Sequence, residues 1–279
     1  MEFNLDCAGK SLTLDQTRIM GVLNITPDSF FSGSRCQDSY LKVAEQMVLD
    51  GADILDVGGE STRPGAAGAP TAEQELERIL PVVEALVSRF DTVISVDTSS
   101  ALVMRESVGA GVGMINDVRA LRREGALEAA VAVNVPVILM HSLIESPEVG
   151  FEPYYDDVVQ EVMNSLVGSV ERCVNAGIAH NQLIIDPGFG GGMFGKTPAY
   201  DLQMLKGFSR FHRLELPVLA GMSRKSFIGA VLNNQAEERL SGSLAVAALA
   251  AQAGAHIVRV HDVAETLDVV RMVNAVRES

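Results

Sequence analysis

Short, almost continuously apolar runs recur along the chain, and longer segments with helical spacing separate them. Runs rich in Ile, Val, Leu and Met without polar alternation are typical of parallel strands that helices cover on both faces. The pattern predicts eight such strands, at Arg18–Ile25, Asp53–Gly58, Thr92–Asp97, Gly113–Val118, Val135–His141, Gln182–Asp186, Leu216–Gly221 and Ala255–His261.

The segments between these runs have the periodicity of helices that bury one face. Thr71 and Gln74 form a candidate capping box at the start of one helix, and Gly177 is a natural stop after another. The expected helices are Ser39–Asp50, Thr71–Phe90, Ser100–Gly109, Glu124–Val133, Tyr155–Ala176, Ala199–Arg213, Ala236–Ala253 and Ala264–Val276.

Repeated strand–helix units without an obvious linker favour an α/β fold, a single (β/α)8 barrel that covers residues 1–279 as one domain. The length of 279 residues agrees with the roughly 250 that such a barrel typically needs. Residues 1–15 are expected to form an N-terminal β-hairpin that covers the bottom of the barrel. An open, doubly wound sheet is the structural alternative.

The chain is acidic, with 22 Lys and Arg against 36 Asp and Glu and a formal charge of −14. Such a charge argues against nucleic acid or an anionic membrane as a partner, so an anionic substrate would need a local cationic cluster. Cys7, Cys36 and Cys173 are dispersed and form no CxxC pair, which suits a reducing compartment. With no evident signal peptide or membrane span, we expect a cytoplasmic enzyme.

Polar residues gather where the predicted strands end. In a parallel barrel these ends meet at one face, where catalytic sites are built from several strands. A single Asp or Asn at such a place often only caps a strand or a helix. All eight strand ends together favour a site, because caps do not require Arg, Lys and His. The residues at or just after these strand ends are Asn24, Asp56, Asp97, Asn116, Asp117, His141, Asp186, Gly221, Lys225, Arg259 and His261.

The charges at this face indicate the chemistry of the ligand. Arg63, Lys225, Arg259 and His261 would bind phosphate in an otherwise acidic chain. The carboxylates of the set suit the N–H donors of a heterocycle, because each offers two acceptor oxygens. Carboxylate and amide oxygens could also hold Mg²⁺ bridged to a diphosphate, whereas no His or Cys cluster has zinc spacing.

Residues Gly190–Thr197 match the phosphate-binding P-loop pattern GxxxxGK[ST]. The context argues against this interpretation. The motif follows the sixth predicted strand, the next helix begins late, and no later strand offers a partner aspartate for Mg²⁺. We therefore expect the match to be accidental.

Seven ordered segments resemble the signatures of the dihydropteroate synthase family, whose members are pterin-binding (β/α)8 barrels. The resemblance extends from Met20 to the C-terminus. The segments are Met20–Phe30, Asp56–Gly65, Ser95–Thr98, Ile115–Asp117, Asp186–Gly190, Gly221–Ser226 and Arg259–Asp262.

The resemblance implies a role for individual residues. The pterin ring would be held by Asp97, Asn116, Asp186 and Lys225. The diphosphate would be bound by Asn24, Thr62, Arg63, Arg259 and His261, and Asn24 would also hold the cofactor Mg²⁺. The p-aminobenzoate would be bound by Pro64, Phe194 and Ser226.

It also implies the reaction, the transfer of a pterin from its diphosphate to p-aminobenzoate in folate biosynthesis. Mg²⁺, Arg259 and His261 would neutralise the leaving diphosphate, Asp97 would stabilise the pterin cation, and Lys225 would contact the ring. The aniline nitrogen would then attack. Family members usually form homodimers, and a homodimer is expected here.

Two other functions remain open from the residues alone. One is a pterin-binding methyltransferase module that serves a corrinoid protein, and the other is a non-catalytic pterin-binding homologue. The combination of Arg63, Arg259 and His261 favours the synthase, because a methyl-pterin carries no diphosphate.

Three places depart from the family pattern. Phe31–Ser34 replaces a segment that usually contains an Asp, Gly191–Met193 looks like an insertion before Phe194, and Ser142–Glu145 departs from the usual residues after the fifth strand. The first two are expected to reshape the p-aminobenzoate pocket.

Overall fold

The computed structural model describes residues 2–25, 34–59, 70–144, 152–190 and 194–279, which form a (β/α)8 barrel, as the sequence predicts. Parallel strands pair in the order β8-β7-β6-β5-β4-β3-β10-β9, and a parallel bridge between Ile185 and Val218 links the two ends of this order. The strands are β3 (Arg18–Asn24), β4 (Ile54–Gly58), β5 (Val93–Asp97), β6 (Met114–Asp117), β7 (Val137–Met140), β8 (Leu183–Asp186), β9 (Leu219–Ala220) and β10 (Ile257–Val260).

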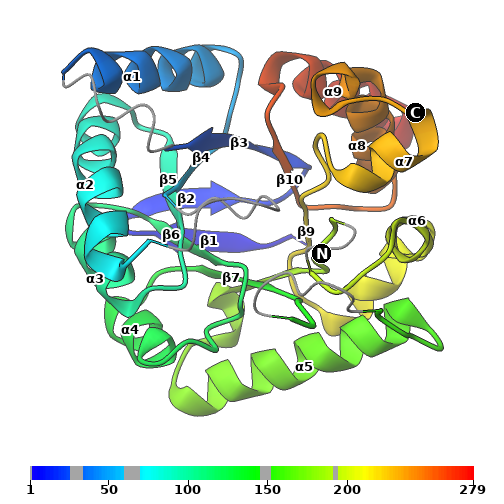
Figure 1. Cartoon of the computed structure of the whole chain (residues 1–279), viewed down its shortest axis with the longest axis horizontal. Helices are drawn as coiled ribbons and strands as arrows, with labels where there is room; N and C mark the ends of the chain where they lie inside the picture. Colours follow the sequence, from blue (N-terminus) through cyan, green and yellow to red (C-terminus); the bar gives the residue numbers. More distant parts are fainter. Residues whose placement is uncertain (1, 26–33, 60–69, 145–151, 191–193) are drawn as a thin grey trace.

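Helices surround these strands (Figure 1). They are α1 (Ser34–Leu49), α2 (Ala72–Arg89), α3 (Ala101–Gly109), α4 (Ala126–Val133), α5 (Val158–Ala176), α6 (Pro198–Lys206), α7 (Ser226–Leu232), α8 (Leu240–Gln252) and α9 (Val263–Glu278). The capping box is confirmed, because Gln74 N donates to Thr71 Oγ1 at 3.3 Å and Thr71 N donates to Gln74 Oε1 at 3.1 Å. Gly177 ends α5 at a φ of 111°, in the left-handed region that favours glycine.

Some boundaries differ from the expected ones. The helix expected at Ala199–Arg213 is interrupted at Gly207, where α6 ends and the 3-10 helix η3 (Phe208–Leu214) begins. A β-carbon on Gly207 would lie 2.9 Å from Val159 of α5, so close packing places a glycine here, and glycine favours a helix end. The segment expected at Ala236–Ala253 likewise begins as a separate 3-10 turn before α8.

The bottom of the barrel is closed by an apolar floor. Every strand contributes one side chain to it, and these are Met20, Ile54, Val93, Met114, Ile138, Ile184, Leu219 and Ile257. The expected N-terminal hairpin, β1 (Asn4–Cys7) and β2 (Lys10–Thr13), packs Leu5, Cys7, Leu12 and Leu14 against the same cluster. Its turn residues Ala8 and Gly9 have φ values of 54° and 86°, as a two-residue type I′ turn requires.

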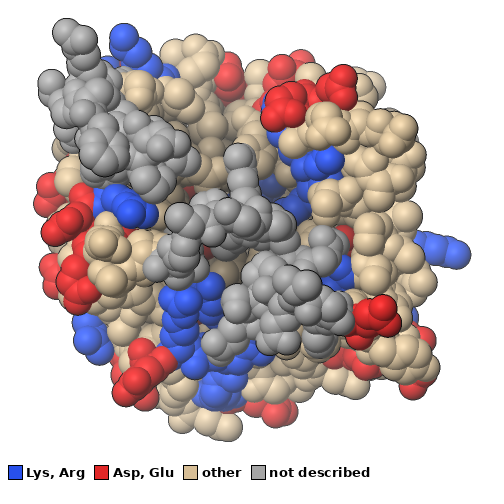
Figure 2. Space-filling view, viewed as in Figure 1, with Lys and Arg blue, Asp and Glu red and all other residues tan. Residues whose placement is uncertain are grey.

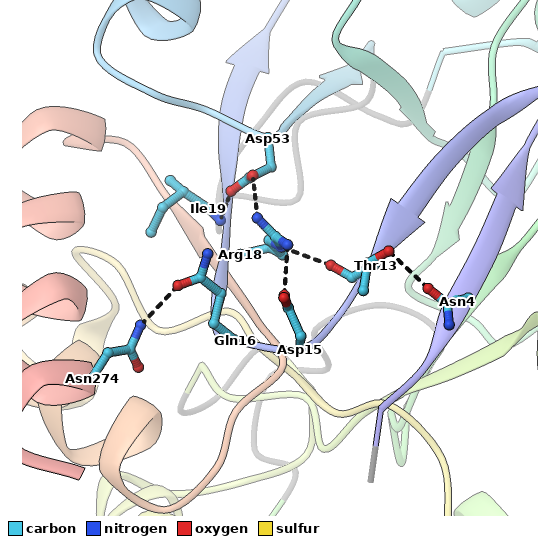
Figure 3. A network of polar contacts seen from close by, with 8 residues as sticks. All are labelled: Asn4, Thr13, Asp15, Gln16, Arg18, Ile19, Asp53 and Asn274. Carbon is cyan, nitrogen blue, oxygen red and sulfur yellow. Dashed lines mark hydrogen bonds and ion pairs between the residues drawn. The ribbon is translucent and has the colours of Figure 1, made fainter. Parts of the chain in front are cut away.

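Polar contacts attach this hairpin to the barrel (Figure 3). The Arg18 guanidinium donates to Thr13 O at 2.7 Å, to Asp15 Oδ1 at 2.6 Å and to Asp53 Oδ1 at 3.3 Å. Asp53 Oδ2 also accepts from Ile19 N at 2.8 Å. The end of the barrel that carries the hairpin is therefore occupied by structural contacts, which leaves the opposite end for a site.

None of the described helices combines the length and the apolar character that a membrane span requires.

The contact between the hairpin and the barrel can be tested at Gly113. A β-carbon there would lie 2.6 Å from the carbonyl oxygen of Cys7, so Gly113→Ala should overpack the floor and lower the free energy of unfolding by ~1–3 kcal/mol. The matched control is Gly168→Ala in α5, where a β-carbon meets no atom within 4 Å. The control should raise stability by roughly 0.5–1 kcal/mol, because alanine is the better helix former. Urea unfolding measures both, and an unchanged Gly113→Ala would contradict the close packing.

Candidate active site

The residue two positions after each floor residue points to the same side of its strand, into the barrel. This period places Asp56 above Ile54, Asn116 above Met114 and Asp186 above Ile184, and all three are buried. Arg259 follows Ile257 in the same way. An apolar floor is therefore overlaid by a polar layer made from different strands.

Arg259 lies at the centre of this layer. Its Nε donates to Asp56 Oδ2 at 2.6 Å and its Nη2 donates to Asp97 Oδ2 at 2.7 Å. Burial alone would lower the pKa of Arg259, but the two carboxylates outweigh that effect and raise it. The guanidinium therefore remains a cation held between two anions from β4 and β5.

The pKa of Asp97 is raised to about 7 because burial penalises its charged form. The nearby Arg259 lowers this pKa, whereas Asp56 and Asp117 raise it. A carboxyl group that titrates near neutral pH inside a barrel mouth is typical of a functional site. Its ionised form depends on the guanidinium beside it.

Asp186 and Lys225 belong to the neighbouring part of the layer. Asp186 Oδ1 accepts from Gly188 N at 2.7 Å, and burial raises the pKa of Asp186 while that hydrogen bond lowers it. Lys225 Nζ donates to Phe189 O at 2.9 Å and lies 4.9 Å from the centre of the Phe194 ring. Burial lowers the pKa of Lys225. These groups present acceptors and a donor at one side of the barrel.

His261 and Asn24 lie closer to the rim. His261 Nδ1 is 3.0 Å from Ser223 Oγ, and the same hydroxyl accepts from His261 N at 3.3 Å. Asn24, at the end of β3, is exposed. Figure 2 shows Lys and Arg side chains on the visible part of this face, with many Asp and Glu side chains nearer its edge. An anion is thus met by local positive charge despite the acidic composition.

Several expected site residues cannot be placed. Thr62, Arg63 and Pro64 lie outside the described residues, as do Phe31–Gly33 and the inserted Gly191–Met193. Ser226 is exposed and begins α7, whereas Phe194 is buried next to Lys225. The two described residues that the sequence analysis expects to contact p-aminobenzoate therefore flank Lys225, Ser226 in sequence and Phe194 in space.

The sequence analysis grouped Asp117 with the carboxylates of the rim, and the structure gives it another place. The buried Asp117 carboxylate accepts from Arg119 N and Leu121 N, each at 2.8 Å, and from Ser99 Oγ. It holds the loop after β6. Ser223 was not singled out, although its position two residues before Lys225 in a strand-end segment was a usable signal.

The P-loop match is accidental, as expected. Lys196 is fully buried and its Nζ lies 2.9 Å from His141 Nδ1, so this lysine does not face a phosphate. Thr197 caps α6 by accepting from Tyr200 N at 3.4 Å. The glycine-rich segment thus supports the interior of the loop after β8.

Comparisons with known proteins agree with this geometry. A family model described as "Pterin binding enzyme" matches residues 20–261. The dihydropteroate synthase of Escherichia coli K12 is 49% identical over 269 residues, which cover 96% of this chain and 94% of that protein. That of Bacillus subtilis is 39% identical over 264 residues, 94% of this chain and 89% of that protein.

Solved structures are similar along the whole chain. The Xanthomonas albilineans dihydropteroate synthase with 4-aminobenzoic acid superposes with a TM-score of 0.91 at 47% identity and covers 100% of both chains. The same enzyme in complex with 7,8-dihydropteroate gives a TM-score of 0.88 at 43% identity and covers 99% of both chains. A Yersinia pestis dihydropteroate synthase with a sulfonamide drug gives a TM-score of 0.93 at 47% identity, and the match covers 99% of this chain and 100% of that chain.

The raised pKa of Asp97 predicts a pH-dependent stability. Between its ordinary pKa of 3.8 and about 7, the folded protein retains a proton that the unfolded chain has lost, so the free energy of unfolding should fall as pH rises. Asp97→Asn should flatten this slope. Urea unfolding at about pH 5 and about pH 8 measures it, with the exposed Asp268→Asn as a control that keeps the wild-type slope. An unchanged slope in Asp97→Asn would rule out this origin.

Proposed function

The chain belongs to the dihydropteroate synthase family of pterin-binding enzymes, and from this premise we propose that it joins (7,8-dihydropterin-6-yl)methyl diphosphate to p-aminobenzoate. The products are 7,8-dihydropteroate and diphosphate, which makes the protein a transferase. The observation that carries this proposal is the polar layer around Arg259. It combines buried acceptors, a lysine donor and a cation in the barrel of a family that binds pterins.

The pterin ring is proposed to bind against the polar layer. Asp97, Asn116 and Asp186 supply acceptors for its N–H groups, and Lys225 supplies a donor to its oxygen and nitrogen acceptors. The Phe189 carbonyl and the Phe194 ring hold the ammonium group of Lys225 in place. A flat heterocycle with donors and acceptors on one edge suits this set of side chains.

The diphosphate is proposed to lie nearer the rim, with Arg259 and His261 as its described cationic partners. Asn24, Thr62 and Arg63 are assigned to it by the family resemblance. Two N–H groups of Arg259 are engaged by Asp56 and Asp97, and a guanidinium has five. The remaining N–H groups can therefore donate to phosphate oxygens while the ion pairs persist.

The p-aminobenzoate is proposed to bind beside Lys225, with Pro64, Phe194 and Ser226 as contacts. Phe194 supports this placement because its ring already lies 4.9 Å from Lys225 Nζ. The exposed position of Ser226 at the first turn of α7 suits a substrate that enters after the pterin. The aniline nitrogen would then approach the pterin from the mouth of the barrel.

The donors at the rim fit Mg²⁺. The point above Gly58 where a β-carbon would lie is 3.8 Å from both Asn24 Oδ1 and Asp97 Oδ2, so an amide and a carboxylate oxygen approach the same place. No group of three or more His, Cys, Asp or Glu among the described residues could hold a metal ion. That agrees with Mg²⁺, which often takes one or two protein oxygens and substrate phosphates. Asn24 would hold it, and the ion would supply neutralising charge to the diphosphate.

The side chains then account for the reaction. The bond from the pterin methylene carbon to the diphosphate oxygen breaks, and its electron pair leaves with the diphosphate. Arg259 and His261 stabilise the negative charge that grows there, and Asp97 stabilises the positive charge left on the pterin. The aniline nitrogen forms the new C–N bond and loses its proton to solvent. Arg259 favours the ionised form of Asp97, because it opposes the burial that raises the pKa of that carboxyl group to about 7.

Turnover with purified components tests the proposal. The wild type should release diphosphate and form dihydropteroate only with both substrates, and chelation of Mg²⁺ should reduce the rate. Asp186→Asn and Lys225→Met should lower kcat/KM for the pterin diphosphate at least roughly a hundredfold, because Asn turns an N–H donor toward the N–H donors of the ring and Met removes the ammonium donor. The exposed Lys206→Met is the matched control and should retain wild-type kinetics.

The alternatives give different results in the same assay. A methyltransferase module would release no diphosphate from this substrate. A non-catalytic homologue would bind the pterin diphosphate in calorimetry without turnover. Wild-type kinetics in Asp186→Asn or Lys225→Met would contradict the site assignment.

We also propose that the chain forms a homodimer through α7, α8 and α9, which lie side by side in Figure 1. Large apolar side chains are exposed on these neighbouring helices, and exposed apolar patches commonly mark interfaces. They are Val231, Leu232, Leu249, Met272 and Val276.

Charge placed on this face should separate the subunits. Leu249→Glu should give a monomer in sedimentation velocity, because burial of an unpaired carboxylate opposes association. Val174→Glu on α5 is the matched control, an exposed apolar residue on another helix, and should remain dimeric. A monomeric wild type at micromolar concentration would contradict the proposal.

A further inference from the structure

Asp56 is a buried carboxylate to which the reaction described above assigns no role. It lies on β4, above Ile54 of the apolar floor, and its side chain is 0% exposed. A charged group in such a place is costly unless its partners compensate it. Its contacts therefore indicate what the position requires.

One oxygen of Asp56 joins two residues that the pterin substrate needs. Asp56 Oδ2 accepts from Asn116 Nδ2 at 3.0 Å and from Arg259 Nε at 2.6 Å. Asn116 comes from β6 and Arg259 from β10, which lie on opposite sides of β4 in the order of strands. Asp56 thus connects the proposed pterin contact to the proposed diphosphate contact.

The contact with Asn116 determines which way its amide faces. A carboxylate has only acceptors here, so the amide must turn its nitrogen toward Asp56, since the flipped amide would bring two oxygens together. Asn116 Oδ1 and the second N–H of Nδ2 remain for a ligand in a fixed order. A pterin carries an amino donor next to a ring-nitrogen acceptor on its pyrimidine edge, which is the complement of that order.

The contact with Arg259 has a similar effect. A guanidinium is planar, so hydrogen bonds at Nε to Asp56 and at Nη2 to Asp97 fix both its position and its plane. The remaining N–H groups then point in a set direction. One carboxylate oxygen of Asp56 therefore orients two residues. Asn116 is the proposed contact of the pterin edge, and Arg259 is the proposed contact of the leaving diphosphate.

The fold does not use the whole Asp56 side chain. Asp56 Oδ1 is buried and has no hydrogen-bond partner among the described residues, and the same holds for Oγ of Ser95, its neighbour on β5. Buried polar atoms usually have a partner, so these two oxygens can accept from a ligand or an ordered water in the barrel mouth. A purely structural counter-charge for Arg259 would not require this arrangement, because Asp97 already contacts the same guanidinium.

We propose that Asp56 is a positioning residue for pterin specificity, which orients the Asn116 amide and the Arg259 guanidinium before the substrate binds. The proposal rests on the proposed function, because it assumes that Asn116 reads the pterin. It does not require Asp56 to touch the substrate.

The test compares two ligands on the Asp56→Asn variant. An amide at position 56 carries both a donor and an acceptor, so the Asn116 amide is free to flip. Calorimetry measures the affinity for 6-hydroxymethyl-7,8-dihydropterin and for its analogue that lacks the 2-amino group. The ratio of the two affinities should fall about tenfold in Asp56→Asn, as expected for one buried hydrogen bond. The KM for p-aminobenzoate should stay within about twofold of wild type, because that substrate does not contact Asn116.

Asp117→Asn is the matched control. Asp117 is also a fully buried carboxylate, but it holds the loop after β6 through Arg119 N and Leu121 N. This variant should lose thermal stability while the affinity ratio stays at the wild-type value. A ratio that falls equally in both variants would show that general destabilisation is the cause and would overturn the proposal.

A second variant covers the case in which Asp56→Asn does not fold. Asp56→Glu keeps the charge and moves the oxygen by one methylene, so it should also lower the ratio. A wild-type ratio in either folded variant would overturn the role of Asp56. If the wild type binds the dihydropterin and turns over, the proposed function stands whatever these ratios are, and a wild type without turnover would instead contradict the proposed function.

Discussion

A guanidinium held between a buried and a partly buried carboxylate is the interaction on which the proposed site depends. Arg259 comes from β10, which β3 separates from β4, and it donates to Asp56 at 2.6 Å and to Asp97 at 2.7 Å. Burial raises the pKa of Asp97, and an unpaired cation would be costly in the same place. Together the guanidinium and the carboxylates keep charges of both signs inside the barrel, where a reaction that separates charge needs them.

A buried ion pair often contributes less than well-packed apolar residues of the same volume. Stability is better explained by apolar packing, both between the strands and the surrounding helices and in the layer below, where one apolar side chain from each strand meets the hairpin. The two layers have different roles. The apolar floor excludes water from below, and the polar layer remains open to ligands from above. Figure 1 shows the hairpin within the ring of helices, in keeping with this closure.

Much of this arrangement could be predicted from the sequence. The continuous apolar runs predicted all eight parallel strands, because residues covered on both faces leave no polar alternation. The prediction of one continuous helix at Ala199–Arg213 was wrong, because α6 ends before Gly207, where the close packing against Val159 favours a glycine. Asp97, Asn116, Asp186 and Lys225 were named from strand ends and the family resemblance. The contacts of Asp56 could not be predicted, because its partners Asn116 and Arg259 are 60 and 203 residues away in the sequence.

The acidic composition and an anionic substrate are compatible for the same reason. A net charge of −14 describes the field far from the molecule, which salt screens over about 10 Å. The proposed binding acts at shorter range, through Arg259, Lys225 and His261 at the mouth of the barrel. Asp56 and Asp97 balance part of the charge of Arg259 in the free protein through their ion pairs. The site therefore does not need a strongly positive surface, since the guanidinium can share its N–H groups between protein carboxylates and phosphate oxygens.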